Sequence, residues 1–515
     1  MTSPAADISL AAKPRHSPMM LLALATGLMS LLPLVVLLLV SVQSDWGTIA
    51  GLLFRPRVAD LLLNTVLLLA LVLPISTALA MTLAWLVERT NLLFARLWSW
   101  AAVAPLALPA FVHSYAWSAF APRFHGLGAG VLISVLAYLP FMYLPIAAQL
   151  RRLDPVLEEV AQSAGKAPLA VFFSVILPQL RLAVLGGGVL VGLHLLAEYG
   201  VFVLTRYDTF ATAIVDQFQV VGGGPSANVM AGVLVLLCLL LLFVESRLRG
   251  VERYARVGAG ASRRQARRSL GHWRWPAVLL PAALASLALG VPIWTLARWV
   301  WFGGTDIWSL DFILPALGQT IVLAMCGAAL TTLAAVPVAW LAVRKPGRLQ
   351  RGLEAAHSYL GAVPGVIIAL ALVTVTVQVA LPLYQTVATL LLAYMLMFLP
   401  RALVGMRSSI AQAPVELEHA AQSLGRSPMA SIWHTTIRLA APGAMASAAL
   451  VAMGITTELT ATLMLAPNGM RTLAMRFWSY TSELDLAAAA PYALLMIAFS
   501  IPLVVLLQTQ TDRQD

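Results

Sequence analysis

Two glutamates stand inside apolar stretches of the sequence, where a charged side chain is costly. Glu198 and Glu458 are 260 residues apart, and we expect each to lie about two-thirds of the way along a membrane span, in its outer half. A charge within a span costs about 2.5–3.5 kcal/mol on insertion scales, so such a residue is a candidate for function. Because hard cations prefer oxygen ligands, two carboxylates could line a route for such an ion. The alternatives are a hydrogen-bonding role between helices, or an ion pair with an arginine at the outer mouth.

Aromatic and imidazole side chains accompany these glutamates. Tyr199 follows Glu198 directly, and His194 precedes it within the same apolar stretch. His113 and Tyr115 stand in another apolar stretch and could reach the same route. We predict that Tyr199 and His113 line a translocation path together with the two glutamates.

Composition indicates an integral membrane protein. The chain has 515 residues, of which 60% are hydrophobic and 11% are charged, whereas ordinary soluble domains are about 25% charged. A soluble core cannot bury so much apolar surface, so the bilayer must act as the solvent. Cys238 and Cys326, the only cysteines, sit in apolar runs. We therefore expect neither a disulfide framework nor a thiolate metal site, and assign no metal ligand.

The apolar runs predict an all-α protein with about twelve transmembrane helices, six in each half. A spanning helix needs about 20 apolar residues, and spans are helical because backbone groups in lipid must pair within their own segment. The run 355–400 is too long for one span and is divided at Leu381-Pro382. The first run follows Lys13 and Arg15, and we read it as an uncleaved span. The other clear runs are 17–44, 61–87, 97–122, 222–244, 275–297, 313–343 and 486–511.

The formal net charge of +11 is explained better by topology than by a nucleic-acid partner. With both termini cytoplasmic, all but seven of the 33 Lys and Arg residues lie inside, which is the positive-inside bias that sets orientation. The densest cluster, in residues 247–274, is expected to lie beside anionic lipid. We predict a multi-pass protein of a bacterial inner membrane. The outer arginines are Arg55, Arg57, Arg123, Arg206, Arg298, Arg471 and Arg476.

The chain contains an internal repeat, which should be sought early in any sequence. Three pairs of segments are 255 residues apart and a fourth pair is 260 apart. Because each copy has an even number of spans, the two halves are parallel repeats about an axis along the membrane normal, with a route between them. The matching segments are 62–66 with 317–321, 84–86 with 339–341, Pro109 with Pro364, and 161–165 with 421–425.

The repeat sets the expected domain boundaries. Each repeat is preceded by an extra span, and a polar, basic linker separates the halves. We expect a tail, first span and outer loop in 1–59, a first transmembrane domain in 60–245, the linker in 246–274, a seventh span and outer loop in 275–314, a second transmembrane domain in 315–508 and a tail in 509–515.

A cytoplasmic loop between the fourth and fifth spans of the first half predicts a helix–turn–helix. Pro155 suits the first turn of a helix, and Glu158 and Glu159 favour its positive N-terminal end. Ala161 is a strong helix former, and Gly165 can end the helix in a left-handed conformation. Two short helices with a glycine turn could present a rigid knob to a soluble partner.

The second half carries the same loop with changes. Glu418 is followed by His419, and Ala421 and Gly425 match the alanine and glycine of the first loop. Two such loops, each between the corresponding spans of a repeat, are a more specific signal than one. The alternative is a pair of ordinary amphipathic cytoplasmic loops.

These loops carry a family resemblance. The pattern Glu159-Val160-Ala161, then Gly165, then Ile176-Leu177-Pro178 resembles the EAA motif of ABC importer permeases. In the second copy His419 stands where the motif has Glu, and Arg438 replaces the later proline. These departures suggest that the two loops are not functionally equivalent.

The resemblance implies a type-1 ABC importer fold and a separate ATP-binding subunit that works as a homodimer. The chain itself lacks a phosphate-binding loop, since Gly165-Lys166 is followed by Ala167 and Val160 stands at the earlier glycine position. No cofactor is therefore expected here; ATP and Mg would be bound by the partner, and the chain would not be an enzyme. The residues implied to contact the ATPase are Glu158, Glu159, Ala161, Gly165, Glu418, His419, Ala421 and Gly425.

The resemblance extends over nearly the whole chain, and it is closest to ferric-iron importers that depend on a binding protein. Similar permeases carry thiamine or phosphonates, which stay open as substrates. An ion-gradient-driven transporter would more often show discontinuous helices and several intramembrane charges. A membrane enzyme would need clustered catalytic groups. The stretches that carry the resemblance are 108–117, 196–200, 209–214, 457–463 and 472–480.

Charged outer loops provide a second predicted contact surface. Arg206 and Arg471 follow the fifth span of each half. We expect them to dock a periplasmic substrate-binding protein through charge pairs; because an exposed pair contributes only about 0–1 kcal/mol, several would be needed. The alternative is that these loops are simply solvated.

Overall fold

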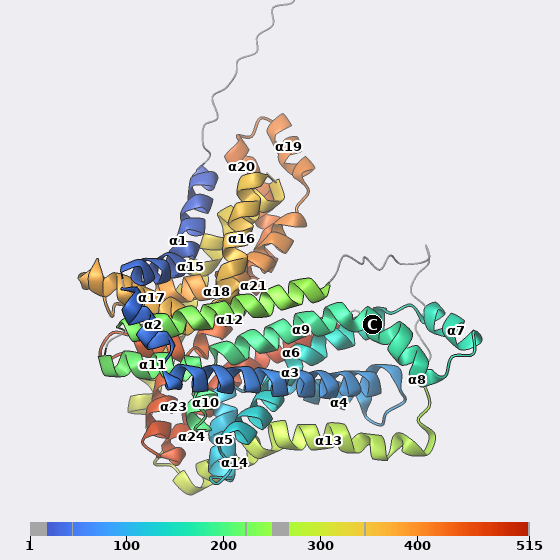
Figure 1. Cartoon of the computed structure of the whole chain (residues 1–515). Coiled ribbons are helices and arrows are strands. Elements are labelled where there is room, and N and C mark those ends of the chain that lie inside the picture. The colour runs from blue at the N-terminus through green and yellow to red at the C-terminus, as the bar shows by residue number, and fades with distance from the viewer. Residues whose placement is uncertain (1–17, 44, 222–223, 250–266, 345–346, 513–515) are drawn as a thin grey trace, which may run out of the picture. The chain divides into compact units, whose positions relative to one another are not determined.

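The computed structural model describes residues 18–43, 45–221, 224–249, 267–344 and 347–512 (Figure 1). Over these residues the fold is all-α, and the extended structure consists of one isolated bridge between Thr90 and Arg268. Ten helices are long and apolar enough to cross a membrane, and two bent helix pairs bring the number to twelve. This confirms the predicted all-α fold with about twelve spans.

The first six spans correspond to one long helix each, with one exception. The third span is a pair of shorter helices, and the short helices between spans belong to loops. The spans are α1 (Pro18–Gln43), α3 (Pro56–Arg89), α4 (Ala95–Val103) with α5 (Ala110–Phe120), α6 (Leu127–Arg152), α9 (Leu177–Ala197) and α12 (Pro225–Arg249); the shorter helices are α2 (Trp46–Leu53), α7 (Pro155–Ser163), α8 (Pro168–Val171), α10 (Gly200–Leu204) and α11 (Phe210–Val221).

The remaining spans repeat this order. The seventh span contains a π-helical turn at Ser286–Gly290 between its two α-helical parts. The spans are α13 (Leu279–Ala285) with α14 (Val291–Gly303), α15 (Leu310–Arg344), α16 (Arg348–Ala362) with α17 (Gly365–Gln378), α18 (Val387–Ala411), α21 (Arg438–Thr456) and α24 (Leu486–Asp512); the shorter helices are α19 (Val415–Ser423), α20 (Pro428–Ile432), α22 (Thr460–Leu465) and α23 (Leu473–Ser482).

The repeated proline marks a break in the third span of each half. Pro109 directly precedes α5 with φ −53° and ψ 141°, and Pro364 precedes α17 with φ −55° and ψ 143°. Proline lacks an N–H and disfavours helical geometry in the residue before it, so a helix usually stops there. Between α4 and α5 the chain bends by 96°. The expectation of one straight span over 97–122 was therefore wrong.

The described residues fall into two compact units. Unit 1 is formed from the segments 1–32, 328–361 and 398–451, and unit 2 from 33–327, 362–397 and 452–515. Neither unit coincides with a sequence repeat, because both draw helices from the two halves. The domain boundaries expected from the repeat remain a prediction.

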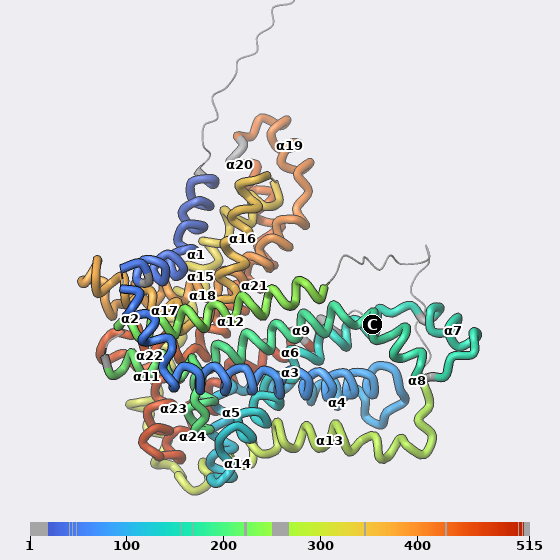
Figure 2. Tube along the Cα trace, in the orientation of Figure 1, coloured from blue at the N-terminus to red at the C-terminus, as the bar shows by residue number. Residues whose placement is uncertain are grey.

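The core of unit 2 joins helices from both ends of the chain. Val72 of α3, Met142 of α6 and Val191 of α9 are buried in one hydrophobic cluster. Leu284 of α13 and Val504 of α24 belong to the same cluster. Figure 2 shows α5, α14 and α24 meeting in this unit, and their residues are in contact. The extra seventh span and the last span thus complete the packing of the first repeat.

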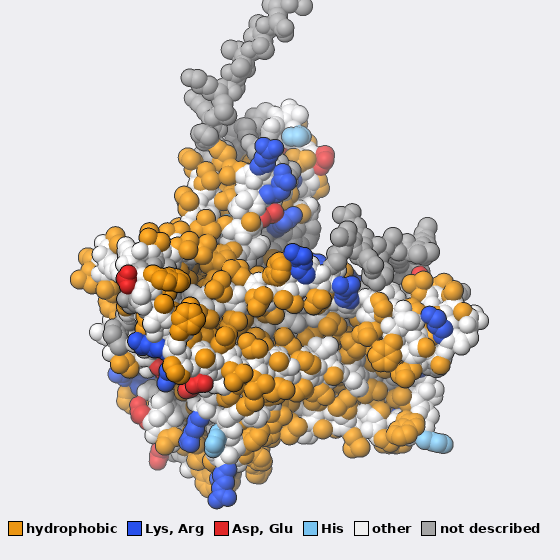
Figure 3. Space-filling model, in the orientation of Figure 1, with side chains coloured by type: hydrophobic (Ala, Val, Ile, Leu, Met, Phe, Trp, Pro, Cys, Tyr) orange, Lys and Arg blue, Asp and Glu red, His pale blue; other side chains and the backbone are white. Residues whose placement is uncertain are grey.

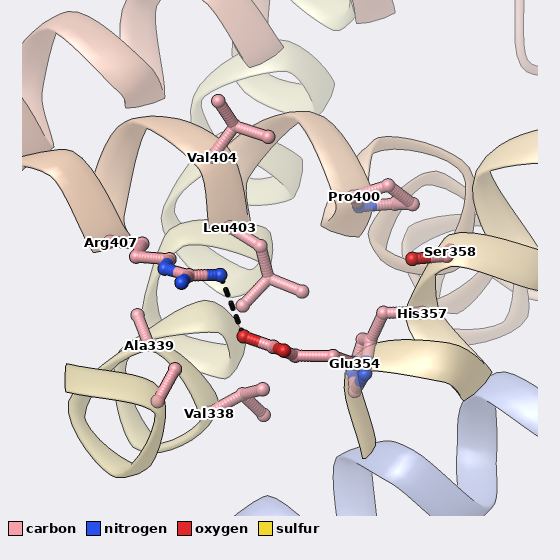
Figure 4. Close-up of a pocket in the computed structure, with 10 residues that line it drawn as sticks. Val338, Ala339, Glu354, His357, Ser358, Pro400, Leu403, Val404 and Arg407 are labelled. Carbon is pink, nitrogen blue, oxygen red and sulfur yellow. Dashed lines mark hydrogen bonds and ion pairs between the residues drawn. The ribbon is translucent and has the colours of Figure 1, made fainter. Parts of the chain in front are cut away.

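Unit 1 has a smaller core and a cavity. Ala23 of α1 packs with Val338 and Leu341 of α15 and with Leu353 of α16. Beside it, α15, α16 and α18 enclose a cavity of about 280 Å³, shown in Figure 4. One ion pair, Arg407 Nη1 to Glu354 Oε1 at 2.7 Å, spans part of this cavity, whose other lining residues drawn in Figure 4 include His357, Pro400, Leu403 and Val404.

Large apolar side chains cover the outside of the helices. Leu63 of α3, Leu236 of α12 and Ile293 of α14 are more than half exposed. In Figure 3, hydrophobic side chains cover most of the visible face of unit 2 along its long helices. A soluble monomer rarely exposes such large contiguous apolar patches, whereas helices facing lipid need them. The chain is therefore a multi-pass membrane protein.

Candidate functional site

Both predicted helix–turn–helix loops are present. In unit 2, α7 and α8 project beyond the ends of α3, α6 and α9 (Figure 1). In unit 1, α19 and α20 connect α18 to α21. The two loops therefore occupy the same place in the order of elements, between the fourth and fifth spans of each half.

The glycine turn has the same geometry in both loops. Gly165 has φ +80° and Gly425 has φ +86°, the left-handed conformation expected from the sequence. The residue after each glycine donates its N–H back to an alanine carbonyl, Lys166 to Ala161 at 3.2 Å and Arg426 to Ala421 at 3.2 Å. A glycine in this position satisfies helix-end carbonyls without steric cost.

The helix starts differ between the loops. Asp154 caps α7, because its side chain accepts a hydrogen bond of 3.0 Å from Val156 N, and Pro155 occupies the first turn as expected. In the second loop Pro414 precedes α19 and provides no side-chain cap. The first loop therefore has one more local restraint than the second.

Glu158 is buried against two arginines. Its side chain is 2% exposed, with Oε1 3.3 Å from Arg89 Nη1 and Oε2 3.5 Å from Arg268 Nη2. The predicted role of Glu158 at a contact surface has to be corrected, because in this chain the carboxylate faces inward. It connects α7 to the end of α3 and to the end of the basic linker.

Glu418 is buried in the same way. Its Oε1 lies 2.8 Å from Arg344 Nη2, and it also accepts a hydrogen bond from the Thr436 hydroxyl. Arg344 donates a further hydrogen bond of 2.8 Å to the carbonyl of Ala413, just before α19. Glu418 thus connects α19 to the end of α15, so its side chain likewise does not point outward.

Arg89 and Arg344 are functional candidates that the sequence reasoning missed. Each is the last residue of the second span of its half, and they are 255 residues apart. That spacing equals the repeat spacing, so a search for repeated charged residues would have found them. Because Glu158 and Glu418 are also repeated, the structure pairs two equivalent arginines with two equivalent glutamates.

The outward surfaces of the loops are mixed apolar and polar. Glu159 and His419 are exposed, whereas Ala161 is buried and Ala421 is half-buried. Large apolar side chains stand beside them: Val160 is 61% exposed and Leu424 is 86% exposed. Exposed apolar groups of this size, with polar neighbours, are typical of protein contact surfaces.

Glu198 and Glu458 lie at helix breaks and not within helices. The α9 helix ends at Ala197, and α10 begins at Gly200; α21 ends at Thr456, and α22 begins at Thr460. The expected position within a continuous fifth span was therefore wrong. Discontinuous helices were expected of ion-gradient-driven transporters, yet this chain contains them in both halves.

Each of these glutamates caps the short helix that follows it. Glu198 Oε1 accepts a hydrogen bond of 3.0 Å from Val201 N, and Glu458 Oε1 accepts one of 2.9 Å from Ala461 N. An acidic side chain stabilises the positive N-terminal end of a helix. Both carboxylates are half-buried in unit 2, close enough for their charges to interact.

A tyrosine in the fourth span joins each glutamate cluster. Tyr138 donates a hydrogen bond of 2.5 Å to Glu198 Oε2. In the second half Tyr394 and Thr462 share a hydrogen bond of 2.7 Å, and Thr462 also donates to the Glu458 carbonyl at 3.0 Å. These contacts support the structural alternative for the glutamates, a hydrogen-bonding role between helices, in addition to any role in transport.

The two predicted neighbours are divided. Tyr199 is buried with its ring centroid 5.3 Å from that of Trp478, a residue of the second half. His113 is fully buried, with Nε2 3.0 Å from the carbonyl oxygen of Ala288 in the seventh span. The structure therefore places Tyr138 at Glu198, and directs His113 toward the seventh span.

The outer loops are fixed by a repeated contact. Asn64 Nδ2 donates to the Asp208 carbonyl at 3.1 Å, and Gln319 Oε1 accepts from Arg471 N at 2.6 Å. Asn64 and Gln319 belong to the repeated segments identified in the sequence. The side chains of Arg206 and Arg471 are exposed, as a contact role requires.

The first outer loop also holds two carboxylates near Arg57. Arg57 Nη2 lies 3.9 Å from Asp208 Oδ2. Burial raises the pKa of Asp216 above its ordinary value, the negative charge of Asp208 raises it further, and Arg57 opposes this shift. Among the described residues, no group of three or more His, Cys, Asp or Glu side chains could hold a metal ion.

Comparison with known proteins identifies relatives over the full length. The profile of the family described as "Binding-protein-dependent transport system inner membrane component" matches residues 332–515. The chain is 34% identical over 499 residues to the Fe(3+)-transport system permease protein FbpB 2 of Haemophilus influenzae, covering 96% of this chain and 99% of that protein.

Two further relatives are more distant. The ferric transport system permease protein FbpB of Actinobacillus pleuropneumoniae is 21% identical over 414 residues, covering 74% of this chain and 58% of that protein. The putative 2-aminoethylphosphonate transport system permease protein PhnV of Salmonella typhimurium is 27% identical over 199 residues, covering 38% of this chain and 75% of that protein.

Proposed function

Because the chain belongs to the family of inner-membrane components of binding-protein-dependent transport systems, we propose that it is the permease subunit of an ATP-driven importer of ferric iron. The near full-length similarity to a relative named as an Fe(3+)-transport permease carries the choice of substrate. The pair of buried Glu–Arg contacts that hold the two loops carries the coupling mechanism.

The two loops would transmit movement from a separate ATPase to the membrane helices. Glu158 holds α7 to Arg89 at the end of α3, and Glu418 holds α19 to Arg344 at the end of α15. A force applied to the exposed Glu159 or His419 surface would therefore reach the second span of each half directly. ATP binding needs only to favour one arrangement of the loops for the transport route to change its accessibility.

The orientation follows from this role. The loops would face the cytoplasm, where an ATP-binding homodimer is available, and both termini would lie on the same side. Arg206 and Arg471 would face the periplasm and contact a substrate-binding protein. Glu198, Glu458 and Tyr199 would lie along the route, where the two carboxylates could attract a ferric ion without holding it as a resident metal.

Uptake of radioactive iron by proteoliposomes tests the proposal. Vesicles would contain the permease with its co-purified ATPase, and the binding protein would be added outside. We expect uptake only when ATP and all three proteins are present. Uptake driven by an ion gradient without ATP would overturn the ATP-driven mechanism.

A phosphonate is the second candidate substrate, because one half of the chain resembles a permease named for 2-aminoethylphosphonate transport. In the same vesicles, ATP-dependent uptake of a labelled aminoalkylphosphonate without iron uptake would keep the importer class and change the substrate.

A further inference from the structure

A cavity of about 510 Å³ lies at the end of unit 2 where α3, α4 and α6 meet the described end of the linker. Glu88 comes from α3, Arg96 from α4, Arg151 from α6 and Arg267 from the linker. Three guanidinium groups and one carboxylate give this cavity a net charge of +2. We propose that it binds the phosphate headgroup of an anionic phospholipid.

The interior of the cavity is already organised. Arg151 is held by Glu88 through two hydrogen bonds, Nε to Oε2 at 2.8 Å and Nη2 to Oε1 at 2.6 Å. This pair is largely buried, whereas the Arg96 and Arg267 side chains are exposed at the rim. Arginine presents several N–H donors in a planar fork that matches phosphate oxygens. The two rim arginines therefore supply the positive charge that the Glu88–Arg151 pair does not balance.

The position of the linker residue is fixed by the backbone. Arg268 N donates to the Arg89 carbonyl at 2.9 Å, and Asn91 N donates to the Arg268 carbonyl at 3.0 Å. Leu270 N donates to Asn91 Oδ1 at 2.9 Å. These bonds hold the linker against the loop between α3 and α4, which places Arg267 beside Arg96 in a defined geometry.

An exposed aromatic residue indicates that the ligand is a lipid. Phe94 lines the same cavity, is 69% exposed, and has φ +56°. A non-glycine residue in the left-handed region is uncommon and strained, and here it turns an apolar ring outward at the end of two spans. Aromatic side chains at the end of spans sit at headgroup level, and basic pockets between spans bind anionic headgroups. A soluble anion would require the arginines but would gain nothing from Phe94.

The lipid site is connected to the first loop through adjacent residues. Arg267 lines the cavity, and Arg268 pairs with Glu158 in α7. A headgroup that orders Arg267 would also order Arg268, and so would stabilise the first loop on α3. That it faces the inner leaflet rests on the proposed function, but the binding site itself does not.

Native mass spectrometry of the purified permease tests the proposal. Phosphatidylglycerol, phosphatidylcholine and inorganic phosphate would be titrated separately in detergent. We expect preferential retention of phosphatidylglycerol. Each basic residue near an anionic headgroup contributes about 1 kcal/mol, so the Arg96→Gln/Arg267→Gln variant should bind it about thirtyfold more weakly.

The cavity of unit 1 provides the matched control. Arg407 lines that cavity but is balanced by Glu354, so Arg407→Gln removes one exposed arginine without touching the proposed site. Phosphatidylglycerol binding should be unchanged in this variant. Equal weakening in both variants would show only a general surface-charge effect and would overturn the site, as would undiminished binding in the double variant.

Two further readouts complete the test. Binding of inorganic phosphate as tight as that of phosphatidylglycerol would overturn the lipid assignment in favour of a soluble anion. The Arg96→Lys/Arg267→Lys variant, which keeps the charge, should recover part of the lipid binding. Because lipid retention is measured without ATP, iron or partner proteins, its outcome is independent of whether the proposed transport function holds.

Discussion

The Arg344 guanidinium lies 2.8 Å from the Glu418 carboxylate, joining the end of α15 to α19. Both side chains are almost entirely enclosed, with 11% and 8% of their surface exposed. Removing one partner of such a pair leaves an uncompensated buried charge, which typically costs about 3–5 kcal/mol. The pair therefore determines whether the second loop stays fixed to its span.

Glu418→Gln should release the second loop and weaken the association with the ATPase. The measurements are the amount of ATPase that co-purifies and the hydrogen exchange of residues 415–432. Glu416→Gln is the control, because Glu416 is on the same helix but exposed. Normal exchange and full ATPase retention in Glu418→Gln would contradict the role of this pair.

Arg268→Gln should affect the first loop only. Arg268 pairs with Glu158, whereas the described residues of the second loop contact no linker arginine. We expect faster hydrogen exchange in residues 155–171 and no change in 415–432. Because Arg89 remains beside Glu158, the effect should be smaller than that of Glu158→Gln. Equal changes in both loops would argue against a local contact.

Gly165→Ala and Gly425→Ala should each strain the turn of one loop. Both glycines have positive φ, and no atom lies within 4 Å of the place where a Cβ would be added. The cost is therefore purely conformational, about 1–2 kcal/mol. Coupling, measured as transport per ATP hydrolysed, should fall. Asn at the same positions tolerates the left-handed region better and should be milder; if Asn were as harmful as Ala, the conformational explanation would fail.

Glu198→Gln together with Glu458→Gln separates charge from capping. The glutamine carbonyl can still accept the hydrogen bonds from Val201 N and Ala461 N, so assembly should persist, while removal of both charges should impair uptake. The corresponding alanine variant also loses both caps, which costs about 1 kcal/mol each, so its thermal stability should drop. Normal uptake by a fully assembled glutamine variant would exclude a role along the route.

Charge reversal tests the outer contact. Arg206→Glu and Arg471→Glu alter exposed side chains, so the fold should be kept. We expect weaker stimulation of ATP hydrolysis by the substrate-binding protein, reduced further at high salt because exposed charge pairs are screened. Arg123→Glu, in another outer loop, is the comparison. An unaltered response in the double variant would place the contact elsewhere.

The sequence predicted the parts of this protein that depend on local patterns. Long apolar runs predicted the spans, and glycine and proline spacing predicted the loops with their left-handed turns at Gly165 and Gly425. The break at Pro109 was visible as a repeated residue, but its effect on the third span was not recognised. Helix formation and chain reversal are set within a few residues, which explains this success.

The contacts between distant residues could not be predicted in the same way. Glu158 was assigned to an outer surface because its position in α7 was known but the direction of its side chain was not. Its partners Arg89 and Arg268 are 69 and 110 residues away, and no periodicity links them. The breaks at Glu198 and Glu458 were missed because apolar residues continue on both sides, which hides the helix ends.

The core of unit 2 has a consequence for how this protein is made. It includes Val72 from the second span and Val504 from the last, with Leu284 from the seventh span between them in the sequence. A chain leaving the ribosome must therefore hold its early helices in the membrane, incompletely packed, until the final helix has been synthesised and inserted. The last residues of the polypeptide close a structure that the first spans began, so a premature stop late in the message would leave the first half without its finished core.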